Sequence, residues 1–320
     1  ITGTGNDRIT GSSAANVIQS GLGNDIVSGG QGDDTLDGGA GNDTLDFSAN
    51  TSAQAVVVNV TTGVASDGVG GTDSFSNFES VVGGQGNDSI TGSSAANRID
   101  AGDGSDVVDG GAGADTVLAG AGADRVVFDA ADSIDGGTGT DSLVIQTATL
   151  DLRTVTTPQV SNLEVLDLTQ EGANEVFLTK AFVDAMGATT TPVKVEGGNT
   201  DVLHLVNSSA NPLTPIWYRD PTADVAATAN TPAYVAYKSG TTTVLVNSNV
   251  RVGEEINGTS AQETIQSGPG NDTITGSAND VLDLANTIGA SGSTPVTANL
   301  TVTLPEGSAD GTAITGNLLG

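Results

Sequence analysis

Aspartate recurs in this chain at intervals that would stack carboxylates in rows. The interval is eighteen residues within two sets, Asp7, Asp25 and Asp43 and then Asp88, Asp106 and Asp124. Two further sets fall halfway between them, Asn16 with Asp34 and Asn97 with Asp115. Carboxylates and backbone carbonyls are the oxygen ligands that Ca²⁺ takes, about six to eight at a time. The spacing therefore indicates rows of ligands for a hard divalent cation.

These aspartates occupy the sixth position of a nine-residue unit. Residues 83–127 read GGQGNDSIT, GSSAANRID, AGDGSDVVD, GGAGADTVL and AGAGADRVV. Glycine is frequent at the first four positions, where it permits left-handed φ and close backbone approach. We expect the first six residues to form a turn and the last three a short strand, whose eighth residue points inward. Two units then make one coil, with successive coils about 4.8 Å apart.

Stacking of this kind needs a compensating charge. Two carboxylates about 4.8 Å apart repel by roughly 3.5 kcal/mol at an effective dielectric constant near 20. A cation between successive turns reverses this repulsion, and its binding energy then becomes folding energy. We therefore expect calcium to drive folding. A single Gly-Asn-Asp turn is usually an ordinary β-turn, but five consecutive units in phase favour a repeated site.

The nonapeptide is a recognised signature of calcium-binding parallel β-helices. It resembles the repeats-in-toxin (RTX) family of secreted bacterial proteins. The resemblance implies an all-β fold, a right-handed parallel β-roll or β-helix that forms a calcium-binding solenoid. It also implies export by a type I secretion system. To this fold we add an irregular β-rich insertion and one short helix.

The predicted metal ligands are the position-six aspartates and the carbonyl groups of the glycines in the same turns. The aspartates are Asp7, Asp25, Asp34, Asp43, Asp88, Asp106, Asp115, Asp124, Asp141 and Asp272. The glycines are Gly21, Gly23, Gly30, Gly32, Gly39, Gly41, Gly84, Gly86, Gly102, Gly104, Gly111, Gly113, Gly120, Gly122, Gly137 and Gly139. The GSSAAN turns at 11–16 and 92–97 lack most glycines and carry Asn, so their sites should be weaker or empty. The position-nine acids, including Asp46, are expected to face water.

The repeats divide the chain into segments. RTX blocks are predicted at 1–46, at 83–145 and, in a shorter form, at 257–283, and the phase slips by one residue after Asp124. Residues 47–82 are expected to form wider coils without calcium, with Phe75 and Phe78 inside and Glu79 solvated or hydrogen-bonded. Residues 284–320 include a strand candidate at 298–304 and are interpreted as a terminal cap or a linker.

Residues 146–256 lose the nonapeptide and are interpreted as a β-rich module. Residues 160–168 are predicted as a strand, and 193–206 and 233–247 as strand pairs. A short helix is predicted near 179–186, capped by Thr179, ended by Gly187, with Phe182, Val183 and Met186 on one face. The order of these segments resembles, more loosely, a module of bacterial adhesins and surface-layer proteins. His204 is expected to be packed or hydrogen-bonded, and Trp217 and Tyr218 to pack in a loop.

Composition narrows the class of protein. The net charge of −30 argues against nucleic acid as a partner, because phosphate binding needs Lys and Arg. Thirty of the 39 acidic residues are Asp, as expected of short-armed turn ligands. There is no cysteine for disulfides and no apolar run long enough to span a bilayer. The chain opens inside a repeat, so we interpret it as part of a longer polypeptide.

The sequence therefore favours a non-enzymatic, extracellular protein. It contains no HExxH, GxSxG or Walker motif, and a single His makes imidazole catalysis improbable. We expect a calcium-binding structural protein of the bacterial surface, a surface-layer subunit or an adhesin, assembling with copies of itself. Cell-surface polysaccharide is a further candidate partner. One alternative is the C-terminal module of a secreted protease, lipase or epimerase, and another is a carbohydrate-binding module using Trp217 and Tyr218.

Overall fold

The computed structural model describes most of the chain up to residue 257. The described ranges are 3–155, 159–170, 172–187, 191–206, 217–219, 221–228 and 232–257, with the strands at 264–266, 273–275, 281–283 and 301–303. The chain separates into two compact units, each made of two stretches. The N-terminal unit comprises Ile1–Gln146 and Gln159–Asp167, and the C-terminal unit comprises Thr147–Pro158 and Leu168–Gly320.

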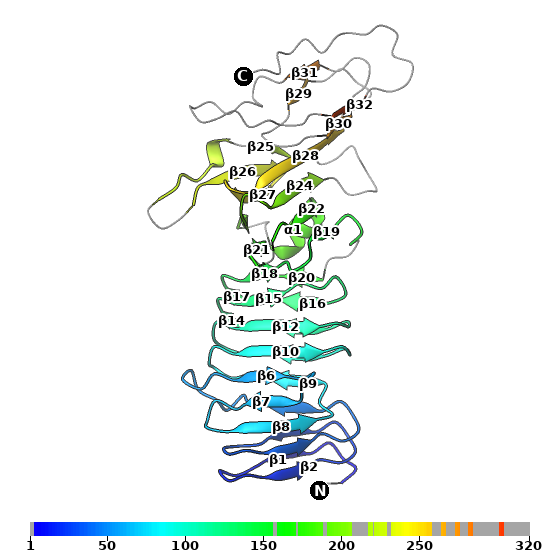
Figure 1. Cartoon of the computed structure of the whole chain (residues 1–320), viewed down its shortest axis with the longest axis vertical. Coiled ribbons are helices and arrows are strands. Elements are labelled where there is room, and N and C mark those ends of the chain that lie inside the picture. Colours follow the sequence, from blue (N-terminus) through cyan, green and yellow to red (C-terminus); the bar gives the residue numbers. More distant parts are fainter. Residues whose placement is uncertain are drawn as a thin grey trace. The chain divides into compact units, whose positions relative to one another are not determined.

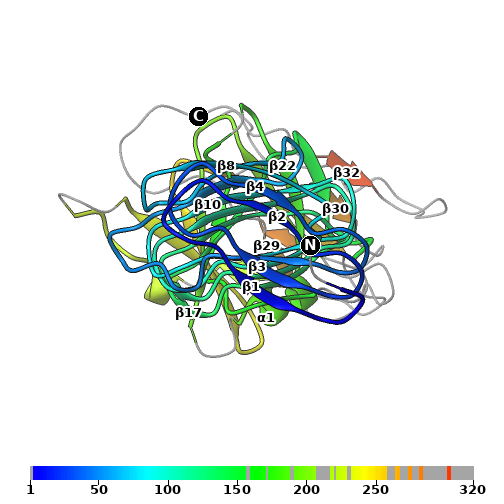
Figure 2. The same cartoon turned by 90° about the horizontal axis from the view of Figure 1, so that it is seen from below.

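The N-terminal unit is a stack of short strands in two mostly parallel sheets (Figures 1 and 2). The first sheet runs in the order β1 (Arg8–Thr10), β3 (Ile26–Ser28), β5 (Thr44–Asp46), β9 (Ser80–Val82), β11 (Arg98–Asp100), β13 (Thr116–Leu118), β16 (Ser133–Asp135) and β20 (Val160–Ser161). The second runs β2 (Val17–Gln19), β4 (Thr35–Asp37), β8 (Thr72–Ser76), β7 (Val64–Ser66), β6 (Val57–Asn59), β10 (Ser89–Ser93), β12 (Val107–Gly111), β15 (Arg125–Val127), β18 (Ser142–Val144) and β21 (Val165–Asp167). A small bridge joins β14 (Ala121–Gly122) to β17 (Thr138–Gly139).

The strand register follows the nonapeptide. Ile9 pairs with Val27, and Val108 pairs with Val126, each partner lying eighteen residues on. Past Asp124 the interval falls to seventeen, as the pairing of Val126 with Leu143 shows. The predicted coil and its phase slip are therefore confirmed.

The core of this unit is a column of aliphatic side chains from position eight of each repeat. These side chains are 1% exposed or less, and they include Val27, Leu36, Leu45, Ile90, Ile99, Val108, Val117 and Val126. The core is narrow, because each nine-residue repeat contributes mainly one aliphatic side chain to it. The turns at both edges must therefore contribute to holding the coils together.

The interruption at 47–82 differs from the prediction of wider coils. β6, β7 and β8 form an antiparallel meander, which enters the second sheet between β4 and β10. Phe75 and Phe78 are buried as predicted, with ring centroids 6.0 Å apart in an edge-to-face arrangement. The meander reverses the strand order locally but leaves β8 parallel to β4 and β6 parallel to β10. The coil can therefore resume without a change of register.

The C-terminal unit combines a parallel sheet with a hairpin and a helix. One sheet runs β19 (Thr149–Asp151), β22 (Glu175–Thr179), β24 (Val202–Val206), β28 (Arg251–Asn257), β30 (Thr273–Thr275) and β32 (Thr301–Thr303). Another places β23 (Val193–Glu196) beside β27 (Thr242–Asn247), β26 (Tyr234–Ser239) and β25 (Tyr218–Arg219). β29 (Thr264–Gln266) pairs with β31 (Val281–Asp283), and a 3-10 turn spans Pro221–Ala223.

The helix prediction is confirmed in detail. α1 (Lys180–Met186) begins after Thr179, whose side chain accepts the Phe182 N–H, and it ends at Gly187 with φ 117°. Phe182, Val183 and Met186 are its buried residues.

Two strand predictions in this part of the chain differ from the structure. Residues 160–168 form two short strands, because Asn162 has a positive φ of 52° and turns the chain between β20 and β21. β23 and β24 join different sheets and do not pair with each other. In contrast, β26 and β27 form the expected antiparallel hairpin.

Candidate calcium-binding turns

Most of the position-six carboxylates are hydrogen-bonded to the preceding coil through one oxygen. Asp106 Oδ1 accepts the Asp88 N–H at 2.7 Å, and Asp124 Oδ1 accepts the Asp106 N–H at 2.8 Å. The opposite edge repeats the contact, since Asp115 Oδ1 accepts the Asn97 N–H at 2.7 Å. The same bond links Asp7 to Asp25, Asp25 to Asp43, Asn16 to Asp34 and Asp124 to Asp141. The predicted stacking of these side chains on two edges is confirmed.

The second carboxylate oxygen is buried and has no hydrogen-bond partner in most of these turns. This holds for Oδ2 of Asp25, Asp34, Asp43, Asp106, Asp115, Asp124 and Asp141. In Asp115, for example, Oδ2 points into its own turn, since a Cβ added to Gly110 of that turn would lie 2.6 Å from it. A buried carboxylate without a partner is strongly unfavourable unless a cation or donor neutralises it. The unpartnered oxygens therefore fit a divalent cation held within the turns.

Two of the predicted aspartates differ, because Asp88 is hydrogen-bonded through both oxygens and Asp7 is partly exposed. Asp88 accepts the Gly84 N–H and the Val56 N–H, both at 2.8 Å. Asp7 Oδ2 accepts the Gly3 N–H at 3.4 Å and is only half-buried. Their need for a cation is accordingly smaller than that of Asp106 or Asp124.

Glycine supplies the backbone conformation of these turns. Fourteen of the predicted glycines have φ between 88° and 154°: Gly21, Gly23, Gly30, Gly32, Gly39, Gly41, Gly102, Gly104, Gly111, Gly113, Gly120, Gly122, Gly137 and Gly139. A Cβ at Gly104 would overlap the carbonyl oxygen of Gly86. Carbonyl oxygens of one turn thus lie directly against the next, where they can join the carboxylates as ligands.

Gly84 and Gly86 differ, because their φ values lie outside the left-handed range. Their turn stacks on the interruption, where a Cβ would meet the Cβ of Asn50 or the backbone N of Ala55 at 2.8 Å. The expected left-handed conformation is therefore wrong for these two glycines, although their lack of a side chain is still required.

The GSSAAN turns close on themselves. Asn97 Oδ1 accepts the Ser93 N–H at 2.7 Å, and Ser93 Oγ accepts the Ala95 N–H at 3.2 Å. Asn16 does the same with the Ser12 N–H at 2.6 Å. No side-chain oxygen is left buried and unpartnered at either asparagine. The amide has thus replaced the charge, in keeping with the expectation of weaker or empty sites.

Burial shifts the titration of the turn carboxylates upward. Loss of water raises the pKa of Asp106 to about 7, with the charges of Asp124 and Asp88 adding to the effect. Burial likewise raises the pKa of Asp141 to about 6, helped by Asp124 and Glu164. The pKa values of Asp34, Asp43, Asp88, Asp115 and Asp124 are raised for the same primary reason. Without a cation, these carboxyl groups therefore keep their protons to a higher pH than exposed aspartates do.

Several carboxylates of the same rows do not belong to a nonapeptide and were missed. Asp132 Oδ1 accepts the Asp115 N–H, and Asp73 Oδ1 accepts the Asp34 N–H, both at 2.9 Å. Asp132 could have been found, because it lies seventeen residues after Asp115, the interval that also separates Asp124 from Asp141.

In two places a glutamate takes the role of the position-six aspartate and accepts the N–H group from the preceding coil. Glu79 Oε2 accepts the Asp43 N–H and Glu164 Oε2 accepts the Asp141 N–H, both at 2.9 Å. Each follows an Asn of positive φ, Asn77 at 59° and Asn162 at 52°. The signal was a repeated tetrapeptide, SNFE at 76–79 and SNLE at 161–164. Glu79 is hydrogen-bonded, one of the two expected outcomes.

One position-nine acid is not at the surface as expected. Asp46 is 6% exposed and forms an ion pair with Arg8 at 2.7 Å, so the guanidinium replaces water as its partner.

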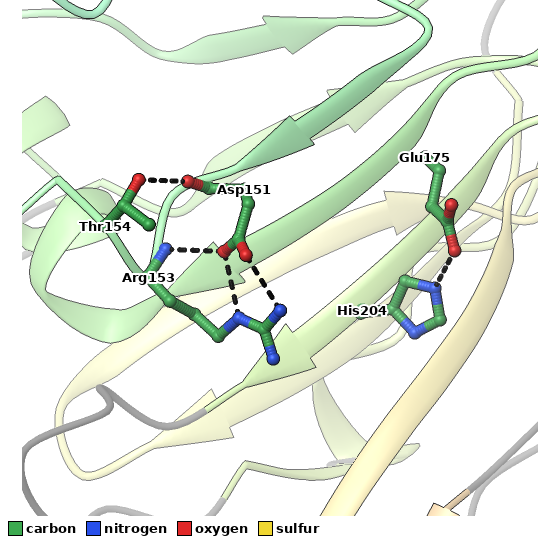
Figure 3. Close-up of polar contacts among 5 residues, drawn as sticks. All are labelled: Asp151, Arg153, Thr154, Glu175 and His204. Atoms are coloured by element: carbon green, nitrogen blue, oxygen red, sulfur yellow. Dashed lines mark hydrogen bonds and ion pairs between the residues drawn. The ribbon is translucent and has the colours of Figure 1, made fainter.

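The single histidine is held by packing in the C-terminal unit. His204 Nε2 lies 3.0 Å from Glu175 Oε1 (Figure 3). The His204 ring also stacks on Phe177, with ring centroids 4.4 Å apart. Arg153 covers the same Phe177 ring and donates to Asp151 at 2.9 and 2.8 Å. The prediction of a packed, hydrogen-bonded His204 is confirmed.

Two further predictions concern Trp217 and Asp272 in this unit. Trp217 is 5% exposed, so its ring is not a stacking platform for a sugar. Asp272, the tenth predicted ligand, lies outside the described residues.

Across the described residues, three or more Asp, Glu or His side chains nowhere converge closely enough to hold an ion alone. A cation in these turns would take its remaining ligands from the carbonyl groups. Within the same residues, the structure shows no helix with the length and apolar character needed to cross a membrane.

Comparison with known proteins follows the repeats. The family RTX calcium-binding nonapeptide repeat (4 copies) matches residues 1–36, 21–49, 75–108, 91–126 and 257–284, together less than half of the chain. No curated protein sequence is significantly similar to the chain. Among solved structures, the extracellular lipase LipA from Serratia marcescens matches at 13% identity and a TM-score of 0.23. That match covers 77% of this chain and 37% of the lipase chain. The segments matched by the family therefore carry RTX calcium-binding nonapeptide repeats.

Proposed function

We propose that the chain is a structural segment of a bacterial cell-surface protein, a surface-layer subunit or an adhesin, that folds and assembles on extracellular calcium. The observation that carries the proposal is the row of buried, unpartnered Oδ2 atoms in consecutive turns. Such a chain would stay unfolded in the cytosol, where calcium is scarce, and fold after type I secretion.

Calcium at extracellular concentration is sufficient for this role. Extracellular calcium modules bind with dissociation constants of about 10⁻⁴–10⁻³ M. A site whose ligand is at about tenfold its dissociation constant gains about 1.4 kcal/mol of folding free energy. Asp25, Asp106 and Asp124 belong to separate turns, so several such gains add along the stack.

The same geometry favours a structural over a catalytic role for this part of the protein. The turn carboxylates are anchored by backbone N–H donors through Oδ1, as between Asp106 and Asp124. His204 is hydrogen-bonded to Glu175 and stacked on Phe177, so it is not poised for proton transfer. The outer face of the second sheet carries exposed Val57, Val64 and Val107, which would suit contacts between copies.

Folding is tested by far-UV circular dichroism of the whole chain with calcium and with EGTA. At neutral pH we expect β structure in calcium and its loss in EGTA, reversed when calcium is restored. An unchanged β spectrum in EGTA would contradict calcium-driven folding.

Assembly is tested separately by electron microscopy in calcium. Lattices or filaments are expected, and a strictly monodisperse monomer would contradict the surface-layer proposal. If the full-length gene product carries a catalytic motif upstream of this chain, the alternative interpretation as the C-terminal module of a secreted enzyme would be favoured instead.

A further inference from the structure

Residues 67–73, with the sequence DGVGGTD, occupy the place of a repeat turn although they lie in the interruption. They lie against the turn at 29–34, where the Thr72 N–H donates to Asp33 Oδ1 at 3.0 Å. A Cβ on Gly71 would overlap the carbonyl oxygen of Gly32. Together with the bond between Asp34 and Asp73, these contacts reproduce the stacking of one nonapeptide turn on another.

Asp67 carries an unpartnered oxygen inside this segment. Its residue is 1% exposed, and Oδ1 accepts the N–H groups of Val69, Gly70 and Gly71 at 2.9, 3.0 and 2.9 Å. Oδ2 is buried and has no hydrogen-bond partner. A Cβ on Gly71 would lie 3.1 Å from this Oδ2, so the orphaned oxygen faces the same point as the Gly32 carbonyl. The three N–H donors fix the carboxylate and leave one oxygen presented.

Asp73 adds a second orphaned oxygen from the same segment. It is 1% exposed, and its Oδ2 is buried without a partner, as is that of Asp34 in the facing turn. Asp73 Oδ1 accepts the Asp34 N–H at 2.9 Å, and Asp67 Oδ2 lies beside Gly71, two residues from Asp73. The three carboxylates therefore lie within electrostatic reach of one another. Three buried charges with unpartnered oxygens at one place point to a bound cation rather than to an ordinary loop.

We propose that residues 67–73 and the turn at 29–34 form a calcium site outside the nonapeptide pattern, with Asp67 and Asp73 as its new ligands. The Gly32 carbonyl oxygen and other backbone carbonyl groups of the facing turn would supply the remaining ligands, because three carboxylates do not converge here closely enough to hold an ion alone. The mixed set of carboxylates and carbonyls suits Ca²⁺, which tolerates irregular coordination, better than Mg²⁺, which demands an octahedron. An open cavity lined by Gly30, Gln31, Asn50, Gln54, Asp67 and Val69 gives the segment access to solvent.

The consequence is that the interruption is itself calcium-dependent. We expected residues 47–82 to be free of calcium, and this site replaces that expectation. Because the ion would link the meander to the first repeat block, calcium would order both together. The inference deepens the proposed calcium-dependent folding, on which it rests, but it depends on carboxylates that the nonapeptides do not contain.

The test counts bound calcium on the full chain by equilibrium dialysis with elemental analysis. Asp73→Asn and Asp67→Asn remove a charged ligand yet keep the Oδ1 acceptor. The matched control is Asp100→Asn, which removes a position-nine carboxylate that the proposed site does not use. We expect each of the first two variants to bind one ion fewer, or to bind one ion at least about tenfold more weakly. The control should bind as the unchanged chain does.

The outcomes separate this inference from the proposed function. If the unchanged chain binds no calcium, the proposed function fails. If it binds calcium but both ligand variants keep the full number of ions at unchanged affinity, only the extra site is overturned. Circular dichroism in saturating calcium checks folding, and a variant that fails to fold is replaced by the other. If neither folds while Asp100→Asn does, the charges are required for folding in calcium, which supports the site.

Discussion

Two neighbouring turns on one edge of the stack close in different ways. In the turn at 110–115, Gly111 and Gly113 take φ values of 91° and 136°, and Asp115 Oδ2 is left buried without a partner. In the adjacent turn at 92–97, Ser93 and Ala95 occupy the equivalent positions without a positive φ. There Asn97 Oδ1 accepts the Ser93 N–H, so the turn satisfies itself.

The strands that follow these two turns are alike in burial and pairing. Ile99 and Val117 are equally buried and pair directly in parallel register. The need for a cation is thus a property of single turns and not of the coil. Asp201 in the C-terminal unit supports this, because both its oxygens accept backbone N–H groups, from Asn174 at 3.0 Å and from Gly198 at 2.6 Å. A buried carboxylate requires calcium only where the turn supplies too few donors.

The largest expected effect is a reversal of pH dependence on removing calcium. Burial raises the pKa of Asp73, Asp132 and Asp141 to about 6 and of Asp106 to about 7, from 3.8 in the unfolded chain. A carboxyl shifted upward stabilises the fold fully below its unfolded pKa, and this contribution is lost as the pH rises through the folded value. In EGTA, stability should therefore fall between about pH 4 and pH 7.

With saturating calcium the sign should invert. The cation holds the carboxylates charged, so acidification releases calcium and stability falls as the pH falls. Urea unfolding followed by circular dichroism at several pH values, with calcium and with EGTA, measures both slopes. Parallel pH profiles in the two conditions would contradict the assignment of the unpartnered oxygens to a cation.

An intermediate effect is expected when one Asp turn is given the side chain of an Asn turn. Asp106→Asn keeps the acceptor for the Asp88 N–H but removes the charge. In calcium the variant should lose about 2.7 kcal/mol of unfolding free energy, the value of one site at about a hundredfold excess. In EGTA at about pH 4, where the metal-free chain is expected to be most stable, it should be as stable as the unchanged chain or more so, because no carboxyl has to be kept protonated at this position.

The matched control for this variant is Asp103→Asn, which alters an exposed carboxylate of the same turn. It should change little in either condition. Equal losses for Asp106→Asn in calcium and in EGTA would show that the carboxylate acts only through hydrogen bonds.

The smallest effect is expected for the reverse exchange. Asn97→Asp restores a carboxylate but not the left-handed positions, because Ser93 and Ala95 remain. It should bind no additional ion and should lose about 1 kcal/mol, since the bond from Asn97 Nδ2 to the Glu79 carbonyl disappears. Dialysis against calcium and urea unfolding measure the two quantities. A gained ion would show that the charge alone makes the site.

Much of the N-terminal unit was predictable because its information is local and repeated. The eighteen-residue interval fixed the register, and position eight fixed the core at residues such as Val27 and Val108. The helix at 180–186 was predictable for a similar reason, since Thr179 and Gly187 mark its ends. The meander was not, because β8 pairs with β4, thirty-nine residues away, and no nearby residue specifies that partner.

By itself, the sequence determined the coil, the two rows of aspartates and the choice of calcium, since each follows from residue types at a constant spacing. Only the tertiary structure decided which carboxylate oxygens lack a partner. Asp88 and Asp106 occupy the same position of the repeat, yet Asp88 is hydrogen-bonded to Val56 and Gly84 while Asp106 Oδ2 is not. The physical reason is that each turn is completed by its spatial neighbour, and across the interruption that neighbour is not the next nonapeptide.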